Sequence, residues 1–338
     1  MASAQQPLVT CIIPARNETA SIRGALQSVL AQDYPLDRIE VVVVDGCSND
    51  DTADVAKRTL DGHDLRRYDV VLNPDGRTPS NLNRGLLWAE GEYIARVDAR
   101  SRIPANYLSR TVSLLETTDA SVVGGRQQAR PAVDELVPTA IARALNNGLA
   151  MGGSRYRIPG TTSGPCDTAY LGVFRTSQLR EMGGWSEPFA TNQDFELNRR
   201  MAALGPVWFL DDIPVEYHPR RTLGELFHQY QRFGSWKVTY WQTTGDKPLP
   251  RQVTLVIAPV AAAIPAFLAF KAWPKAVAAS ALLAALGADQ AGTDGPDVPP
   301  AGRLISVAAM AAVGGGWWSG VAKGALQALT RGRRGPIG

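Results

Sequence analysis

Short apolar runs alternate with helix-like segments through the first hundred residues of the chain. Residues 8–14 (LVTCIIP) and 39–45 (IEVVVVD) are nearly continuous apolar runs rich in β-branched side chains. This pattern is typical of strands buried on both faces of a parallel sheet. Apolar side chains at helical spacing follow the first run, over residues 22–30, before an Asp-Tyr-Pro stop at 33–35. The pattern predicts a strand–helix–strand unit.

Two further elements continue this alternation. A helix is expected over roughly residues 80–89, and a strand over 93–97, ending at Asp98. Alternation at this length predicts an α/β fold with a doubly wound, mostly parallel central sheet and flanking helices. Ligands of such sheets bind beyond the carboxyl ends of the strands, where Glu18, Asp45 and Asp98 are expected. The sequence therefore predicts three carboxylates at one edge of the sheet.

The pattern changes abruptly after Arg251. Residues 252–270 carry no charge and approach the ~20 residues that a helix needs to cross a bilayer; shorter apolar runs cover 276–288 and 304–321. Because positive residues favour the cytoplasmic side, Arg251 and the arginine-rich tail at 331–334 predict an even number of crossings. We expect two. The alternative is an alanine-rich soluble helical bundle.

Composition narrows the partners. The formal net charge is only +3, from 35 basic and 32 acidic residues, so we expect no nucleic-acid partner. Three widely separated cysteines, Cys11, Cys47 and Cys166, lack the spacing of a zinc site or a disulfide framework. The first ten residues lack the features of a secretory signal. A cytoplasmic domain is therefore expected.

Five motifs carry a resemblance to a known family. They are CIIPARNE (11–18), VVVDGCSNDDT (42–52), GEYIARVDAR (91–100), NQDFEL (192–197) and QYQRF (229–233). In this order they resemble the family 2 glycosyltransferases, which have the GT-A fold, and within that family the succinoglycan ExoA-like group. The resemblance extends from about Val9 to Trp236, and the hydrophobic last third of the chain is similar in kind.

The resemblance implies a domain organisation and an activity. A GT-A catalytic domain would cover residues 1–245, with a donor-binding half at about 8–100 and an acceptor half at about 101–245. Membrane-associated helices would follow at 246–338. The implied enzyme is an inverting, metal-dependent glycosyltransferase that moves a sugar from a nucleotide-diphosphate donor, UDP-glucose or a related UDP-hexose. Its acceptor would be a lipid-linked or membrane-proximal glycan in cell-surface or exopolysaccharide synthesis.

The resemblance also implies a location and partners. The protein would lie at the inner (cytoplasmic) membrane, with its catalytic domain facing the cytoplasm. Proteins of a polysaccharide-assembly complex are further expected partners.

Residues implied to bind the nucleotide sugar are spread over several motifs. Pro14, Ala15, Arg16 and Glu18 would form one wall of the slot for the base, and Asp45 would accept a hydrogen bond from the base. The alternative for Asp45 is a turn residue ahead of a glycine. The other implied donor-binding residues are Arg77, Asn83, Asp98, Arg100, Arg220, Gln229 and Arg232.

The implied metal site departs from the family pattern. Most relatives carry Asp-x-Asp after the third strand, where carboxylates hold Mg²⁺ or Mn²⁺ against the diphosphate. Here the triplet is Asp98-Ala99-Arg100, and a guanidinium cannot ligate a cation. Asp98 remains the expected ligand, while Arg100 contacts phosphate or faces solvent. His218 is a second candidate ligand, with a packed or surface histidine as the alternative.

The implied general base lies in NQDFEL. Inversion at an anomeric carbon needs a base that deprotonates the attacking hydroxyl, and the resemblance assigns this role to Asp194. Gln193 stands where the family more often has Glu. The alternative is helix capping by Asn192 or Asp194, and the two roles are compatible.

Other classes of function remain as alternatives. A catalytically weak scaffold that binds nucleotide sugar within a membrane polysaccharide-assembly complex is supported by Arg100 and Gln193. A Rossmann dehydrogenase is disfavoured because CIIPARNE stands where the G-x-G-x-x-G turn would follow the first strand. A processive synthase is disfavoured because QYQRF lacks the tryptophan of the processive members.

Overall fold

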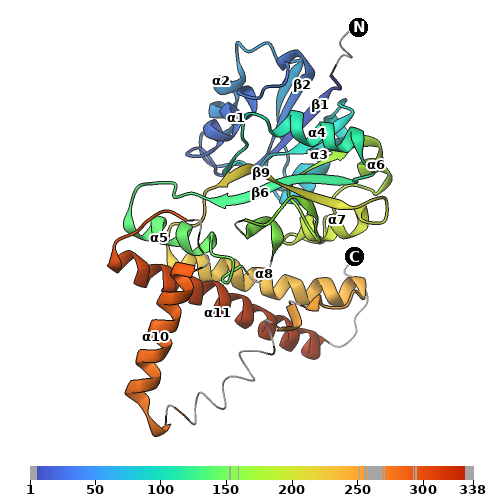
Figure 1. Cartoon of the computed structure of the whole chain (residues 1–338). Helices are drawn as coiled ribbons and strands as arrows, with labels where there is room; N and C mark the ends of the chain where they lie inside the picture. The colour runs from blue at the N-terminus through green and yellow to red at the C-terminus, as the bar shows by residue number, and fades with distance from the viewer. Residues whose placement is uncertain are drawn as a thin grey trace. The chain divides into compact units, whose positions relative to one another are not determined.

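The computed structural model describes residues 6–151, 154–158, 160–250, 252–254, 257, 269, 271–291, 293 and 295–331. The chain divides into two compact units. The first consists of Met1–Gln127 and Gly160–Tyr217, and the second of Gln128–Pro159 and His218–Gly338. Figure 1 shows the strands and helices of both units.

A mixed sheet forms the centre of the first unit. Its strands are β1 (Val9–Ala15), β2 (Ile39–Asp45), β3 (Arg67–Leu72), β4 (Tyr93–Arg96), β5 (Ser101–Arg102), β6 (Val122–Ala129), β7 (Gly164–Pro165), β8 (Tyr170–Arg175) and β9 (Val207–Tyr217). Their order is β3-β2-β1-β4-β8-β6-β9-β5, and β7 pairs with β9. The first four strands are parallel, and β8 pairs antiparallel to both β4 and β6. The predicted α/β fold is confirmed.

Helices cover both faces of this sheet. Helices α1 (Ile22–Leu30), α2 (Thr52–Leu60) and α4 (Tyr107–Thr117) pack against one hydrophobic cluster. A second cluster contains side chains of α3 (Thr78–Trp88), α6 (Thr176–Glu181) and α7 (Gln193–Met201). Successive residues of β2 alternate between the two clusters, which is why its sequence is apolar throughout.

The predicted elements of the first unit are found within two residues of their expected bounds. The helix expected over 80–89 begins at Thr78, with Pro79 in its first turn, a position that proline favours. Its Gly85 packs on β1 so closely that a Cβ there would lie 2.4 Å from Cγ2 of Ile12. Strand β3 was not predicted, because it is an edge strand with half-buried and exposed side chains.

The described part of the second unit is helical. It contains α5 (Leu136–Leu145), α8 (Leu223–Thr244), α10 (Pro274–Ala291) and α11 (Pro300–Arg331). The side chain of Thr222 caps α8 by accepting a bond from the backbone N–H of Glu225, and Gly245 ends it in the left-handed conformation. Figure 1 shows α11 alongside α8.

One helix in the described part of the chain, over Pro300–Thr330, is long and apolar enough to cross a membrane. It contains the predicted run at 304–321, whereas the run at 276–288 lies within α10. Most of the expected first crossing, residues 252–270, falls outside the described residues. Two crossings therefore stay a prediction.

Candidate active site

The loops after β1 and β2 are joined by hydrogen bonds at the carboxyl edge of the sheet. The backbone N–H of Asn17 donates to Oγ of Ser48 at 2.9 Å, and that of Glu18 donates to Oγ1 of Thr52 at 2.8 Å. The backbone N–H of Asn49 donates to Oδ1 of Asn17. Backbone strain at non-glycine residues tends to occur at functional sites, and Asn17 has a φ of 55°. The two loops form one layer over the strand ends.

Asp45 ends β2 as a buried carboxylate. It accepts bonds from the backbone N–H and the hydroxyl of Ser48, an arrangement typical of a turn residue. The predicted wall residues lie at the end of β1, which is in register with β2: Pro14 is half-buried, Ala15 is buried and Arg16 is exposed. Recognition of the base by these residues stays a prediction.

Arg77 and Asn83 both contact the turn around Trp185. The amide nitrogen of Asn83 donates to the backbone carbonyl of Trp185 at 2.8 Å, and its Oδ1 accepts from the Trp185 N–H at 2.8 Å. Arg77 pairs with Asp75 at 2.8 Å and donates to the carbonyl of Glu187. These contacts stabilise the turn around Trp185, which is a structural role. A contact of Arg77 or Asn83 with the sugar donor stays a prediction.

Arg100 pairs with Glu18. Its Nε donates to both carboxylate oxygens, at 2.7 and 2.9 Å, and the hydroxyl of Ser21 donates to Oε2 of Glu18 at 2.6 Å. Arg100 thus neutralises the carboxylate that was predicted to line the slot for the base. The guanidinium is about a third exposed, so a phosphate could still reach it.

A central contact of the first unit is made by Arg96, which the sequence analysis did not single out. Arg96 is the last residue of β4, and its side chain is 6% exposed. Its Nε donates to Oδ1 of Asp98 at 2.7 Å, and its Nη1 donates to Oδ1 of Asp194. One buried guanidinium therefore joins the predicted metal ligand to the predicted base.

A sequence signal for Arg96 did exist. It stands among the buried apolar residues of GEYIARVDAR, and a buried charge requires a partner. One partner, Asp98, lies two residues away, but the other, Asp194, lies on α7, far along the chain.

Both carboxylates of this cluster are accessible to solvent. The side chain of Asp98 is 30% exposed and that of Asp194 is 40% exposed. The hydroxyl of Tyr170 lies 2.6 Å from Oγ of Ser101, and burial raises the pKa of Tyr170, with the negative charge of Asp98 adding to the shift. Tyr170 therefore stays a neutral hydrogen-bonding group beside the carboxylates at neutral pH.

Asp194 lies in the first turn of α7. Asn192 precedes the helix with a φ of 65°, and its side chain does not cap the helix. Capping by Asn192 is therefore wrong. The first turn of a helix favours a carboxylate through the exposed backbone N–H groups. Asp194 therefore contacts Arg96 from the first turn of α7, a position that favours a negative charge.

The remaining predicted residues belong to the second unit. Nδ1 of His218 lies 3.3 Å from the carbonyl oxygen of Arg130. Arg220 and Gln229 are half-buried, and Arg232 is exposed. Their roles toward a donor or a metal stay predictions.

The chain offers few ligands for a cation. Among the described residues, no group of three or more His, Cys, Asp or Glu side chains is placed to hold one. Asp98 is a single carboxylate with one oxygen bonded to Arg96. This donor set fits Mg²⁺ or Mn²⁺ bound by one carboxylate and otherwise by substrate phosphates and water, a common arrangement for Mg²⁺.

The chain has an α/β fold with carboxylates at the carboxyl edge of its sheet, which is where sheets of this class bind their ligands. Residues 10–179 match the family described as glycosyl transferase family 2. The succinoglycan biosynthesis protein ExoA of Rhizobium meliloti is 31% identical over 255 residues, which are 74% of this chain and 75% of that protein. The chain belongs to the family 2 glycosyltransferases.

Two other relatives extend the comparison. A dolichyl N-acetyl-α-D-glucosaminyl phosphate 3-β-D-2,3-diacetamido-2,3-dideoxy-β-D-glucuronosyltransferase of Methanococcus voltae is 25% identical over 68% of this chain and 72% of that protein. Among solved structures, the mannosyltransferase PcManGT of Pyrobaculum calidifontis, in complex with GDP-Man and Mn²⁺, matches with a TM-score of 0.58. The match has 23% identity and covers 96% of this chain and 88% of that one. This likeness supports the GT-A fold.

Proposed function

We propose that the protein transfers a sugar, with inversion, from a nucleotide-diphosphate donor to a lipid-linked or membrane-proximal glycan acceptor. The observation that carries the proposal is the position of Arg96 between Asp98 and Asp194. The guanidinium of Arg96 contacts two carboxylates. Asp98 is suited to binding a cation, and Asp194 is suited to abstracting a proton.

In this proposal Asp194 is the general base. It takes the proton of the acceptor hydroxyl while the hydroxyl oxygen forms a bond to the anomeric carbon. The bond from that carbon to the diphosphate oxygen breaks on the opposite face, and the nucleoside diphosphate leaves with the electron pair. Arg96 holds one oxygen of Asp194, which leaves the other oxygen to accept the proton.

Asp98 and Arg100 are proposed to bind the diphosphate end of the donor. A bound Mg²⁺ or Mn²⁺ would neutralise charge that develops on the diphosphate. Asp98 would supply the carboxylate ligand, and Arg100, released from Glu18, would contact phosphate oxygens. The second-unit residues His218, Arg220, Gln229 and Arg232 are proposed to assist from the acceptor half of a catalytic domain over residues 1–245.

The donor, the acceptor and the location are proposed from the relationship to ExoA. A UDP-hexose such as UDP-glucose is the proposed donor, and exopolysaccharide synthesis at the cytoplasmic face of the inner membrane is the proposed context. The apolar helix over Pro300–Thr330 supports attachment to a membrane.

The proposal is tested with a panel of nucleotide sugars in membranes containing the protein, with and without Mn²⁺. Release of nucleoside diphosphate and transfer to lipid extract are both measured. Mn²⁺ should stimulate the wild type and have little effect on Asp98→Ala, whereas Arg100→Ala should bind donor more weakly and keep its response to Mn²⁺. Donor binding without turnover, for every sugar of the panel, would instead favour the scaffold.

A further inference from the structure

α11 is long and apolar enough to cross a membrane, but its contacts with other helices argue against a crossing. An 18-residue window within Pro300–Thr330 has a mean hydropathy of 1.4. The first turns of α11 nevertheless carry Arg303 and Ser306, which both contact the fully buried carboxylate of Asp289. These contacts determine where the start of α11 can lie.

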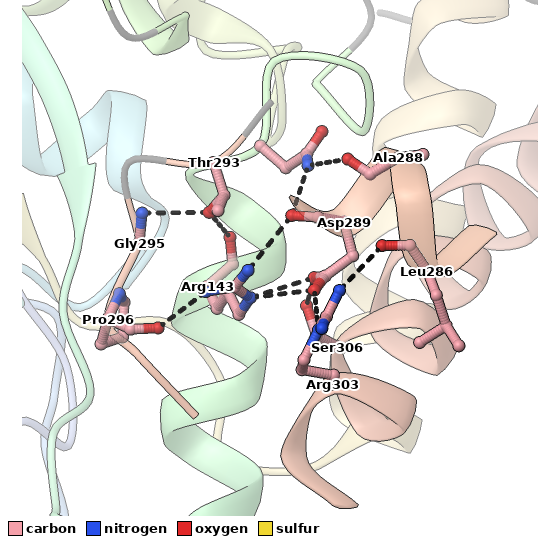
Figure 2. Close-up of polar contacts among 10 residues, drawn as sticks. Arg143, Leu286, Ala288, Asp289, Thr293, Gly295, Pro296, Arg303 and Ser306 are labelled. Carbon is pink, nitrogen blue, oxygen red and sulfur yellow. Dashed lines mark hydrogen bonds and ion pairs between the residues drawn. The ribbon is translucent and has the colours of Figure 1, made fainter. Parts of the chain in front are cut away.

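Asp289 is the centre of a buried ionic cluster that joins three helices, and Figure 2 shows it. Nε of Arg143, on α5, donates to both oxygens of Asp289 at 3.2 and 3.0 Å. Ser306 donates to Oδ1, and Nε of Arg303 lies 3.5 Å from Oδ2. The side chains of Arg143 and Asp289 are 5% and 0% exposed. A charge buried to this degree is strongly destabilising once it loses its partner.

Hydrogen bonds from side chains to backbone carbonyls connect the turn between α10 and α11 to the same cluster. Arg143 donates to the carbonyl of Asp289 at 3.3 Å and to that of Pro296 at 3.3 Å. The amide of Asn147 donates to the carbonyl of Ala288 at 2.8 Å. The last carbonyls of a helix lack partners within it. Here Arg143 of α5 and Asn147, which lies two residues beyond α5, donate to two of them. The turn is therefore fastened to α5.

A stripe of glycines holds the middle of α11 against α8. The stripe consists of Gly316, Gly320 and Gly324. A Cβ on Gly316 would lie 2.5 Å from the carbonyl oxygen of Phe227, and one on Gly320 would lie 2.0 Å from that of Gln231. The contact advances by four residues in the same direction on both helices, so the two helices run parallel. α11 accordingly follows α8 along its length.

Short links to the sheet limit where α5 and α8 can lie. α5 begins after residues 130–135, which follow β6, and α8 begins after residues 218–222, which follow β9. Five or six residues span at most about 20 Å, less than the ~30 Å of a hydrocarbon core. Neither link is therefore long enough to cross a bilayer.

We propose that α11 does not cross the membrane but lies along its cytoplasmic surface beside α8, with the α10–α11 turn on the cytoplasmic side. The inference rests on the membrane attachment proposed above. The partner that we propose for the exposed face of α11 is an anionic lipid surface. Trp318, Leu326 and Leu329 are exposed apolar side chains of α11 that would enter the interface, while the exposed Lys323 would contact headgroups.

The side of the turn is tested with Asp297→Cys, an exposed position in the turn. Intact spheroplasts are treated with a membrane-impermeant maleimide, and the native cysteines of the first unit serve as the cytoplasmic control. We expect no labelling in spheroplasts and one additional labelled thiol after lysis. Labelling of Asp297→Cys in intact spheroplasts, with the parent protein unlabelled, would overturn the proposal.

The docking of α11 is tested with two glycine variants of the same helix. Gly320→Leu should force α11 away from α8, whereas Gly314→Leu is the matched control because a Cβ there meets no atom within 4 Å. With the protein bound to phosphatidylglycerol vesicles, trypsin should cut at Lys323 faster in Gly320→Leu than in Gly314→Leu. Equal cleavage in both would contradict docking on α8.

Membrane attachment is measured separately by flotation with the same vesicles. Protein that does not float overturns this inference, whatever its transferase activity. Protein that floats and fails to turn over any donor leaves the topology in place and counts against the proposed activity. The two proposals therefore fail on different measurements.

Discussion

The ionic clusters centred on Arg96 in the first unit and on Asp289 in the second unit have opposite compositions. In the first unit a single guanidinium, Arg96, pairs with two carboxylates. In the second unit a single carboxylate, Asp289, contacts two guanidiniums. The first cluster has an excess of negative charge and the second an excess of positive charge.

Exposure separates the roles of the two clusters. The side chains of Asp98 and Asp194 are 30% and 40% exposed to solvent, so a cation or a hydroxyl can replace part of their contact with Arg96. Asp289 is fully enclosed, and its oxygens already accept three bonds from Arg143 and Ser306. A partly exposed ionic cluster can exchange partners during a reaction, whereas a fully satisfied buried one specifies how helices dock.

The largest effect is expected at the first cluster, where we propose that Asp194 acts as the general base. Asp194→Asn keeps the shape of the side chain and cannot accept the proton, so transfer should fall by ~10²–10⁴-fold. Donor binding, measured by calorimetry, should survive. Asp212→Asn, which changes an exposed aspartate of β9 paired with Arg110, is the control and should transfer normally. Near-normal turnover by Asp194→Asn would remove it from the role of base.

The second cluster should respond in stability. Asp289→Asn leaves Arg143 without its buried counter-charge. Breaking such a pair typically lowers the free energy of unfolding by about 3–5 kcal/mol. Asp297→Asn, in the exposed part of the same turn, should change stability by less than about 0.5 kcal/mol. Urea unfolding followed by tryptophan fluorescence measures both. Equal midpoints would show that the cluster does not hold the helices.

Replacement of Arg96 tests whether it positions the two carboxylates. Arg96→Met removes two charge-assisted hydrogen bonds, each worth about 1.5–3 kcal/mol, so kcat should fall by at least ~10-fold. Arg96→Lys restores the charge without the forked geometry and should recover part of the loss. The pH–rate profile should also shift in Arg96→Met, because Asp194 loses its cation. A stability loss with an unchanged kcat and pH profile would assign Arg96 a purely structural role.

The smallest effect concerns Cys11, a thiol in the core of the first unit. Burial raises the pKa of Cys11 to about 12, so the protonated thiol favours the folded state. Its contribution to stability is complete below the unfolded pKa of about 9 and is lost as the pH rises toward 12. At pH 8 Cys11 should resist alkylation in the wild type and equally in Asp289→Asn. Faster alkylation in the variant would mean that the second cluster also holds the first unit together.

The sequence predicts elements whose signal is local. The continuous apolar runs of β1 and β2 reveal buried parallel strands, since every residue must suit one of two cores. β3 has no such run, because one edge of the strand is unpaired and several of its side chains reach solvent. The run at 304–321 has the composition of a spanning helix, and sequence alone does not reveal the contacts with α8.

The two carboxylates of the candidate site could be predicted from the sequence, whereas the guanidinium of Arg96 could not. Asp98 and Asp194 lie in motifs with recognisable neighbours, so they were identified from the sequence. The role of Arg96 depends on a residue 98 positions farther along the chain. The same holds for Arg143, which requires a partner 146 positions away. Such pairings are set by the tertiary fold, and a local pattern does not contain them.

The separation between Arg143 and Asp289 has a consequence for synthesis of the chain. A ribosome that adds about 5–20 residues per second needs roughly 7–30 s to extend the chain by the 146 positions from Arg143 to Asp289. During that time Arg143 has no carboxylate to meet, and the glycines of α11 have not been made. The second unit thus completes its fold at the end of translation, whereas most strands of the sheet exist much earlier. A chain truncated before Asp289 should therefore expose α5 and α8 to proteases and chaperones.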